Sequence, residues 1–337
     1  MRSLREDGLR IGGLEAGPRC SIADVEGVRV GHVSVVRDEP EVVRTGVTAV
    51  VLGASLGQPL RAGVAVLNGA GEMTGSLQVA EWGVIQTPVY LTATMAVGRV
   101  YDGAIAAAVA ADPAVGVEDV VIPVVTECDD SWLSDPRAVH VEAADVGRAL
   151  AEADADFAQG AVGAGTGMVS FDFKGGIGSA SRVAGATVGV LVLANFGERR
   201  HLRVDGVPVG ALLGDPAAAR PRPAGSCIVV VATDAPLGSA QLTRTARRAG
   251  LGLARTGSTG HHGSGEIFLA LSTARGEPLP DTDLDPLFEA TVDATEEAVV
   301  NALWHAETTV GREGRVAPAL PHDAVLELLE RHGRLSG

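Results

Sequence analysis

Residues 225–255 read GSCIVVVATDAPLGSAQLTRTARRAGLGLAR, and this stretch decides the fold class. Its apolar run, 227–232, is typical of a strand that is buried on both faces. Turn-forming residues over 234–238 end that strand, and a helical pattern begins with Ser239 in the place of an N-cap. The apolar residues of the helix fall on one stripe: Leu242, Ala246, Ala249 and Leu253. A strand followed directly by an amphipathic helix predicts a mixed α/β protein.

The same alternation recurs through the rest of the chain. Apolar runs bounded by turn-forming residues predict strands at 47–52, 117–125, 186–194, 227–232 and 267–271. Helical periodicity predicts helices at 99–111, 138–153, 239–254, 285–306 and 321–332. In the helix from 285, Asp285 is placed as the cap with Pro286 at the first position, and Glu296 and Glu297 are expected on its solvated side.

Composition limits the functional classes. The 337 residues are 46% hydrophobic and 20% charged, which suits a globular protein with a large core. A net charge of −15 with dispersed arginines argues against binding nucleic acid, so small molecules or peptides are the expected partners. No apolar run is long enough to cross a membrane, and we expect a cytoplasmic protein. Three widely spaced cysteines are expected to be reduced thiols.

The Gly225–Ser226 junction has the character of a self-cleavage site. If this bond is cut, Ser226 becomes an N-terminus that carries a hydroxyl nucleophile and, next to it, its own α-amine as a base. The residues before it, PRPA at 221–224, are also what an ordinary loop entering a strand looks like. From the junction alone, both interpretations stay open.

Several motifs in order make the chain resemble a known family. They are RTGVTAV (44–50), NGAGEMTG (68–75), GAGTGM (163–168), GS (225–226), RTGST (255–259) and GSGE (263–266). Together they resemble the P1 family, peptidase family S58, of self-processing N-terminal-nucleophile aminopeptidases, which includes D-stereospecific and β-peptidyl aminopeptidases. The resemblance covers most of the chain and is far more specific than any single motif.

The resemblance implies a role for each matching residue. Cleavage before Ser226 would give an α chain, 1–225, and a β chain, 226–337, with Ser226 as the nucleophile. Ser264 and Glu266 match a supporting pair that orients or activates the nucleophile, and Asn195 matches a hydrogen-bond donor to the oxyanion. These roles are chemically needed, because a serine hydroxyl alone is a poor nucleophile and a developing oxyanion requires a fixed donor.

The spacing of the supporting pair adds an independent argument. Ser264 and Glu266 are two residues apart, so in an extended segment they share a face, where the carboxylate can accept the serine hydrogen bond. The acidic segment TECDDSW, 126–132, follows a predicted strand. Within it, Glu127 matches the acid that recognises the free amine of the substrate. Asp129, expected to help bind substrate, stands where the characterised aminopeptidases have an oxyanion-assisting tyrosine.

Other assignments remain as alternatives. A metal-dependent hydrolase could use His261 and His262 with Asp129 and Asp130, although adjacent histidines point apart on a strand. Cys128 could be a nucleophile, but no sequence feature identifies its base. The glycine-rich 163–167 segment lacks the Lys of a phosphate-binding loop and is expected to allow close backbone packing. The chain could also act on non-peptide amide oligomers, or remain uncleaved as a binding protein.

We therefore predict a four-layered αββα sandwich of the N-terminal-nucleophile aminopeptidase kind, in one intertwined domain over 1–337. The predicted activity is release of N-terminal residues from small peptides, amides or esters, with no metal or cofactor. The family resemblance also implies a homo-oligomer, possibly a tetramer. Lys174, the single lysine of the chain, has no role in this scheme.

Overall fold

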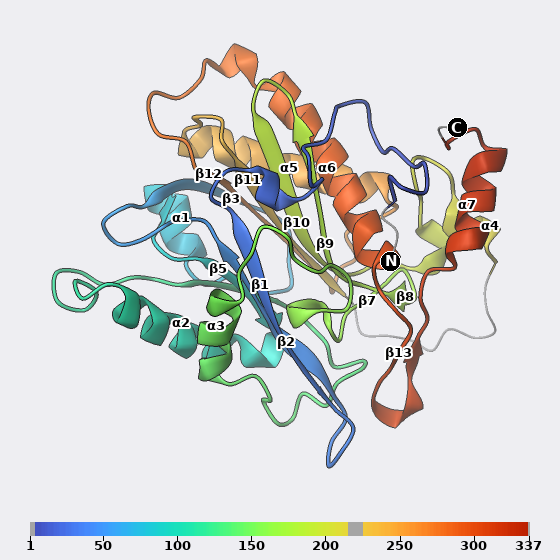
Figure 1. Ribbon diagram of the computed structural model, residues 1–337, viewed down its shortest axis with the longest axis horizontal. Helices are drawn as coiled ribbons and strands as arrows, with labels where there is room; N and C mark the ends of the chain where they lie inside the picture. The colour runs from blue at the N-terminus through green and yellow to red at the C-terminus, as the bar shows by residue number, and fades with distance from the viewer. Residues whose placement is uncertain (1–3, 215–224, 336–337) are drawn as a thin grey trace.

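Two β-sheets lie face to face between two pairs of helices in the computed structural model, which describes residues 4–214 and 225–335 (Figure 1). The larger sheet has the order β4-β3-β12-β11-β10-β9. Its strands are β4 (Val84–Ile85), β3 (Leu60–Gly69), β12 (Gly265–Ser272), β11 (Ser226–Thr233), β10 (Thr187–Asn195) and β9 (Gly176–Val183). Only β11 and β12 pair in parallel, and the other neighbours in this sheet are antiparallel.

The smaller sheet has the order β1-β2-β5-β6. Its strands are β1 (Arg29–Arg37), β2 (Val43–Val51), β5 (Val89–Ala93) and β6 (Val124–Cys128). Two short ribbons lie outside these sheets: β7 (Val169–Ser170) with β8 (Phe173–Lys174), and β13 (Thr309–Val310) with β14 (Val316–Ala317). The β7–β8 ribbon pairs Val169 with Lys174, and it lies near the end of β10.

The helices cover the outer faces of the sheets. Helices α5 (Ser239–Arg255) and α6 (Asp285–Trp304) pack on the larger sheet, and α2 (Val97–Ala111) and α3 (Ala143–Ala151) pack on the smaller one (Figure 1). The remaining helices are α1 (Ser76–Trp82), α4 (Val209–Leu212) and α7 (His322–Arg331). This arrangement confirms the predicted αββα sandwich.

Strand alternation divides the core into three layers. In β11, Val230 points into the core between the sheets, and Val231 points into the core under α5 and α6. Val47 of β2 belongs to the third layer, beneath α2 and α3. Because both faces of β11 are covered, its sequence is continuously apolar instead of alternating. This is why 227–232 could be recognised as a strand.

Four of the five predicted strands are confirmed with small shifts of their ends, as β2, β10, β11 and β12. The prediction for 117–125 was wrong over most of its length. There the strand begins at Val124, and Val117 and Val120 are exposed in the preceding loop. Pro123 is consistent with the late start, because proline has no N–H to donate to a strand ladder and is found mainly at strand starts, bulges and edges.

The predicted helices are also present, with corrections at their ends. The helix predicted from residue 138 begins at Ala143, and Ser239 and Asp285 are first helical residues, preceded by Gly238 and Leu284 as N-caps. The stripe predicted on α5 is buried throughout.

The prediction that Glu296 and Glu297 are solvated was wrong, because α6 is buried nearly all round. Glu297 accepts hydrogen bonds from Arg5 at 3.0 Å and forms a fully buried ion pair with Arg182. Glu296 lies 3.4 Å from Arg255. The second face of the helix is thus covered by charged groups from distant segments.

Close backbone packing at 163–167 is confirmed. A Cβ built on Gly167 would lie 2.1 Å from the Arg44 carbonyl oxygen, and one on Gly165 would lie 2.6 Å from the Ile177 nitrogen. Only glycine fits such approaches. Among the helices of the described chain, none has the length and apolar character needed to span a membrane.

Candidate active site

The register of the larger sheet brings the predicted catalytic residues to one end of it. Ser226 is the first residue of β11, and its antiparallel partner is Asn195, the last residue of β10. Its parallel partner on the other side is Gly265, the first residue of β12. Because Ser264 and Glu266 flank Gly265, all four residues lie at the same end of three adjacent strands, with Ser264 directly before β12.

These side chains divide between the two faces of the sheet. Ser226 has the same parity as Ile228, which lies in the core between the sheets, and Asn195 is its direct cross-strand partner. Glu266 is paired with Cys227, which points to the helical side. Ser226 and Asn195 therefore share the inter-sheet face, and Glu266 lies on the other.

Ser264 and Glu266 interact as their spacing predicts. The Ser264 hydroxyl donates a short hydrogen bond to Oε1 of Glu266, and both residues are buried. Oε2 of Glu266 has no hydrogen-bond partner among the described residues. Burial raises the pKa of Glu266, while the Ser264 hydrogen bond and the nearby His261 act in the opposite direction.

Asn195 is held at both ends of its amide. Its Oδ1 accepts a hydrogen bond of 2.9 Å from the backbone N–H of Val169, and its Nδ2 donates one of 2.8 Å to the carbonyl oxygen of Asp129. The Val169 donor fixes which end of the amide carries oxygen. An amide nitrogen has two hydrogens, so one N–H of Asn195 is left to donate to another acceptor. This is the property that an oxyanion donor needs.

Gly225 is fixed by contact with Asn195. A Cβ on Gly225 would lie 1.7 Å from the Asn195 carbonyl oxygen, and all its nearest neighbours are backbone atoms. The residue before Ser226 therefore has to be glycine for the backbone to approach this closely. The rest of the predicted loop before it, 221–224, lies outside the described residues.

Glu127 belongs to β6 itself, so the predicted acidic segment begins inside the strand. Its Oε1 accepts a hydrogen bond of 2.9 Å from the Glu72 backbone N–H, and its Oε2 accepts a short one from the Thr94 hydroxyl. The residue is 2% exposed, and burial raises the pKa of its carboxyl. Each carboxylate oxygen can still accept a further hydrogen bond, for example from an ammonium group.

Asp129 contributes its backbone more than its side chain. The carboxylate accepts hydrogen bonds from the Ser131 N–H at 2.9 Å and the Ser131 hydroxyl at 2.8 Å, so it stabilises its own turn. The carbonyl oxygen holds Asn195. The sequence singled out Asp129 for its charge, and no sequence signal points to this use of its carbonyl.

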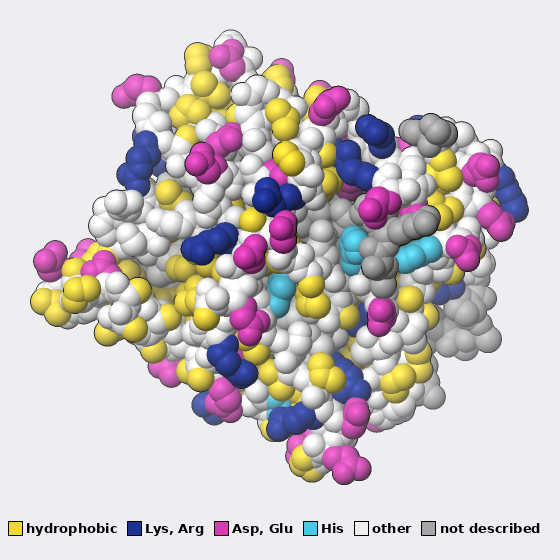
Figure 2. Space-filling view, viewed as in Figure 1, with side chains coloured by type: hydrophobic (Ala, Val, Ile, Leu, Met, Phe, Trp, Pro, Cys, Tyr) yellow, Lys and Arg dark blue, Asp and Glu magenta, His cyan; other side chains and the backbone are white. Residues whose placement is uncertain are grey.

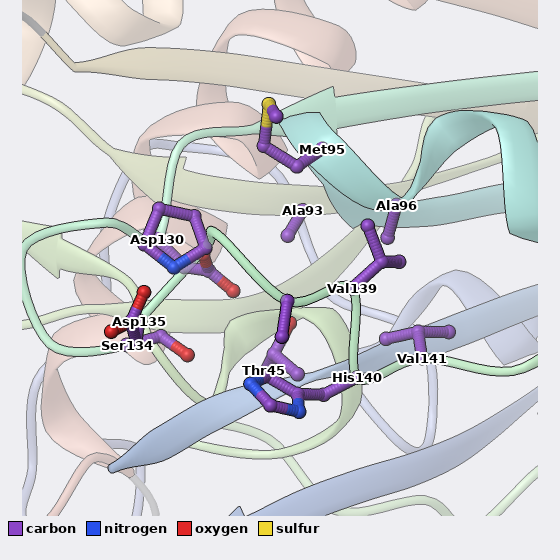
Figure 3. Close-up of a pocket in the computed structure, with 12 residues that line it drawn as sticks. Thr45, Ala93, Met95, Ala96, Asp130, Ser134, Asp135, Val139, His140 and Val141 are labelled. Atoms are coloured by element: carbon purple, nitrogen blue, oxygen red, sulfur yellow. The ribbon is translucent and has the colours of Figure 1, made fainter. Parts of the chain in front are cut away.

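Asp130 lines a small pocket beside this turn (Figure 3). Thr45, Met95, Ser134 and His140 also line it, and it has room for about one water molecule, about 20 Å³. Asp130 is 3% exposed, and its Oδ2 has no partner in the described chain. Burial raises its pKa to about 7.

The sequence did not reveal two residues that support the site, Thr94 and Asn68, because both act by hydrogen bonding to other site residues. Thr94 orients Glu127, as described above. Asn68 of β3 donates from Nδ2 to the carbonyl oxygens of His261 at 3.1 Å and His262 at 2.9 Å, and by a short bond to that of Ser264. An Asn at the end of a strand before a glycine-rich segment is the one available signal for Asn68.

The alternative sites find little support in the geometry. Cys128 points into the inter-sheet core, and burial raises the pKa of its thiol well above the usual value, which disfavours the reactive thiolate. His261 lies 3.8 Å from Glu198. Within residues 4–214 and 225–335, no three His, Cys, Asp or Glu side chains gather in a group that could hold a metal ion.

Comparison with known proteins gives consistent matches over nearly the whole chain. The beta-peptidyl aminopeptidase BapA of Sphingosinicella microcystinivorans is 39% identical over 95% of this chain and 90% of its own. A Burkholderia sp. beta-aminopeptidase is 41% identical with a TM-score of 0.91, covering 98% of this chain and 99% of that one. The L-aminopeptidase D-Ala-esterase/amidase of Ochrobactrum anthropi, described as an Ntn hydrolase variant, is 36% identical, with a TM-score of 0.93 and full coverage of both chains.

The family model for peptidase family S58 matches residues 20–317. That match contains all the candidate site residues, and the two solved structures share the overall fold on which the site is built. The chain is therefore a member of peptidase family S58, a peptide hydrolase with aminopeptidase or amidohydrolase activity and the Ntn hydrolase fold.

Proposed function

We propose that the chain cuts its own Gly225–Ser226 bond and then uses Ser226 to release N-terminal residues from small peptides, amides or esters. The products of self-cleavage would be chains 1–225 and 226–337. The observation that carries the proposal is the strand register, which sets Ser226 between Asn195 and the Ser264–Glu266 pair. A nucleophile, an oxyanion donor and a supporting carboxylate then occupy one strand end.

Self-cleavage would begin at the Gly225 carbonyl carbon. The Ser226 hydroxyl attacks this carbon, the Gly225–Ser226 amide bond breaks, and the Ser226 nitrogen takes a proton to become an amine. Water then hydrolyses the resulting ester, which returns the hydroxyl to Ser226 and leaves a carboxylate on Gly225. The tight approach of Gly225 to the Asn195 backbone supports this step, because it fixes the residue that carries the scissile carbonyl against the residue that carries the oxyanion donor.

Turnover would use the same hydroxyl and the freed α-amine. An α-amine has a pKa of about 8, which suits a general base near neutral pH. It would accept the hydroxyl proton as Ser226 attacks, and the remaining N–H of Asn195 would bind the oxyanion. Proton return expels the amine product, and water hydrolyses the acyl-serine. The Ser264–Glu266 pair, on the opposite face, would hold the α-amine in place.

Glu127 would select substrates with a free amino terminus. An ammonium ion is strongly attracted to a buried carboxylate, and Glu127 has spare acceptor capacity on both oxygens. The names of the relatives include beta-peptidyl and L-amino acid substrates, which fits a site that anchors the amine instead of the side chain. Asp129 would serve substrate binding mainly by holding Asn195. Asn195 would then stabilise the oxyanion without the tyrosine that characterised aminopeptidases have at the position of Asp129.

We further propose a homo-oligomer, possibly a tetramer, in the cytoplasm. Leu67, Leu77 and Trp82 are 60%, 85% and 69% exposed, and apolar surface of this kind is typical of subunit contacts. All three cysteines are unpaired, which is common in a reducing compartment. Acidic and basic side chains are interspersed on the face shown in Figure 2, which offers no continuous basic surface for nucleic acid. Light scattering after size-exclusion chromatography tests the assembly.

The test of the function combines mass spectrometry with a substrate panel. The wild type should yield fragments of roughly 23 and 11 kDa by residue share, the smaller beginning at Ser226. It should hydrolyse β-alanyl p-nitroanilide but not the N-acetylated form. Ser226→Ala should remain one chain and be inactive. An uncleaved, inactive wild type would instead indicate a binding protein, and activity restricted to non-peptide amide oligomers would redirect the substrate assignment.

A further inference from the structure

Lys174 is buried without a carboxylate partner in the described chain. Its side chain is fully inaccessible, and Nζ donates hydrogen bonds to three backbone carbonyl oxygens, those of Gly165 at 2.9 Å, Met168 at 2.7 Å and Gly175 at 2.7 Å. A buried ammonium is costly unless it is fully hydrogen-bonded. Here three N–H groups meet three acceptors, so the site matches the charged form. Burial lowers the pKa of Lys174 to about 7.

Two of the three carbonyls that bind Lys174 belong to the turn leading to Val169. Gly165 and Met168 precede Val169, and Val169 is itself paired with Lys174 across the β7–β8 ribbon. Gly175 also donates its N–H to the Met168 carbonyl at 3.0 Å. The lysine side chain thus holds the turn before Val169, and the ribbon register places Val169 opposite Lys174.

Val169 in turn orients Asn195, because its N–H is the donor to Oδ1 of the Asn195 amide. From these contacts we propose that Lys174 is a positioning residue for catalysis, which holds the oxyanion donor Asn195 in its working orientation through the turn at 165–169. The inference rests on the proposed function, in which Asn195 is that donor. Losing the ammonium would release the turn and let the amide rotate.

The expected signature is a change in kcat without a change in KM. An oxyanion donor acts in the transition state, and its removal typically costs about 10²–10³-fold in kcat. Lys174→Met, which keeps the length of the side chain, should lower kcat at least about tenfold and change KM less than about twofold. The assay is β-alanyl p-nitroanilide hydrolysis, normalised to the amount of free Ser226 N-terminus.

Asn195→Ala and the double variant separate positioning from general destabilisation. If Lys174 acts through Asn195, adding Lys174→Met to Asn195→Ala should change kcat less than about twofold. For any variant that cleaves itself too slowly to yield mature enzyme, the first-order rate of self-cleavage replaces kcat. The matched control is Ser272→Ala, which loses a buried hydrogen bond of 2.6 Å at the far end of β12 and should lower Tm but not kcat.

A wild-type kcat in Lys174→Met would overturn the proposal. It would also be overturned if the fold-losses in kcat of the two single variants multiplied in full in the double variant. If Lys174→Met does not fold, Lys174→Gln is measured instead, because it keeps N–H donors. Failure of both to fold would also overturn it, since the lysine would then serve the whole fold. Wild-type kcat in Asn195→Ala would refute the proposed function instead, so the two failures are distinguishable.

Discussion

Replacing Gly225 by alanine should block self-cleavage while leaving the cleaved enzyme active. The new Cβ would lie 1.7 Å from the Asn195 carbonyl oxygen, whereas real Cβ contacts stay beyond 3.0 Å. The two backbones must therefore separate by at least 3.0 − 1.7 = 1.3 Å. Gly225 immediately precedes β11 and the contacted atoms belong to the backbone of Asn195 and Phe196, so no side-chain rotation relieves the contact.

That displacement is large on the scale of a reacting geometry. Attack requires the hydroxyl oxygen within about 3–3.5 Å of the carbonyl carbon, and a shift of about 1 Å can cost about 10²-fold in rate. We expect the first-order rate of self-cleavage to fall about a hundredfold or more, equivalent to about 2.7 kcal/mol in activation free energy. Once the bond is cut, Gly225 is a chain end and can move away, so kcat per free Ser226 should stay within about threefold of wild type.

The assay is an intact-mass time course of freshly purified precursor at pH 8, with activity followed in parallel. The matched control is Gly147→Ala in α3, because a Cβ there has nothing within 4 Å. The control should cleave normally and gain about 0.5–1 kcal/mol of stability from the helix interior. Self-cleavage of Gly225→Ala at the wild-type rate would refute the reasoning, since the contact would then not constrain the scissile bond.

Two predictions concern buried charge. Burial raises the pKa of Asp130 to about 7 from an ordinary 3.8, so the native state holds this proton more tightly than the unfolded chain and the free energy of unfolding falls as pH rises through that window. Asp130→Asn should therefore match wild type near pH 4 and exceed its stability at pH 8 by up to about 4 kcal/mol, and urea unfolding that shows a loss at pH 8 would contradict this. Glu297→Gln, which leaves Arg182 without its counter-ion, should cost about 3–5 kcal/mol in the same assay. The exposed pair partner Glu327, changed to Gln, should cost less than about 1 kcal/mol, and equal losses would show that burial does not set the cost.

The sequence pattern located the central strands well, whereas the four-layered arrangement was predicted from the family resemblance. Residues 227–232 are covered on both faces, so they read as a continuous apolar run. The failure at 117–125 has a local cause, since Pro123 could have marked the start of the strand. The prediction that Glu296 and Glu297 are solvated failed because residues far away in the sequence cover them. Helical periodicity finds one buried stripe, and it cannot reveal that Arg5 and Arg182 cover the opposite face of α6.

The same limit applies to the site. The pairing of Ser264 with Glu266 follows from a spacing of two in an extended segment, which a sequence displays directly. The groups that hold Asn195 are the Val169 N–H and the Asp129 carbonyl, and every residue type except proline carries both of these backbone groups. Their use is decided by register and turn geometry, so no side-chain pattern could reveal them.

A departure from regular pairing also shapes the site. Along β3 and β12, Ile267 pairs with Val66 but Glu266 pairs with Asn68, so Leu67 is the extra residue of a β-bulge. Without the bulge, strand alternation would keep Asn68 on the face of Val66, away from Glu266. The extra residue brings Asn68 to the face of Glu266, where its Nδ2 binds the carbonyls of the 261–264 turn. The turn that presents Ser264 is thus held by an irregularity in the neighbouring strand, which places the amide where regular pairing could not.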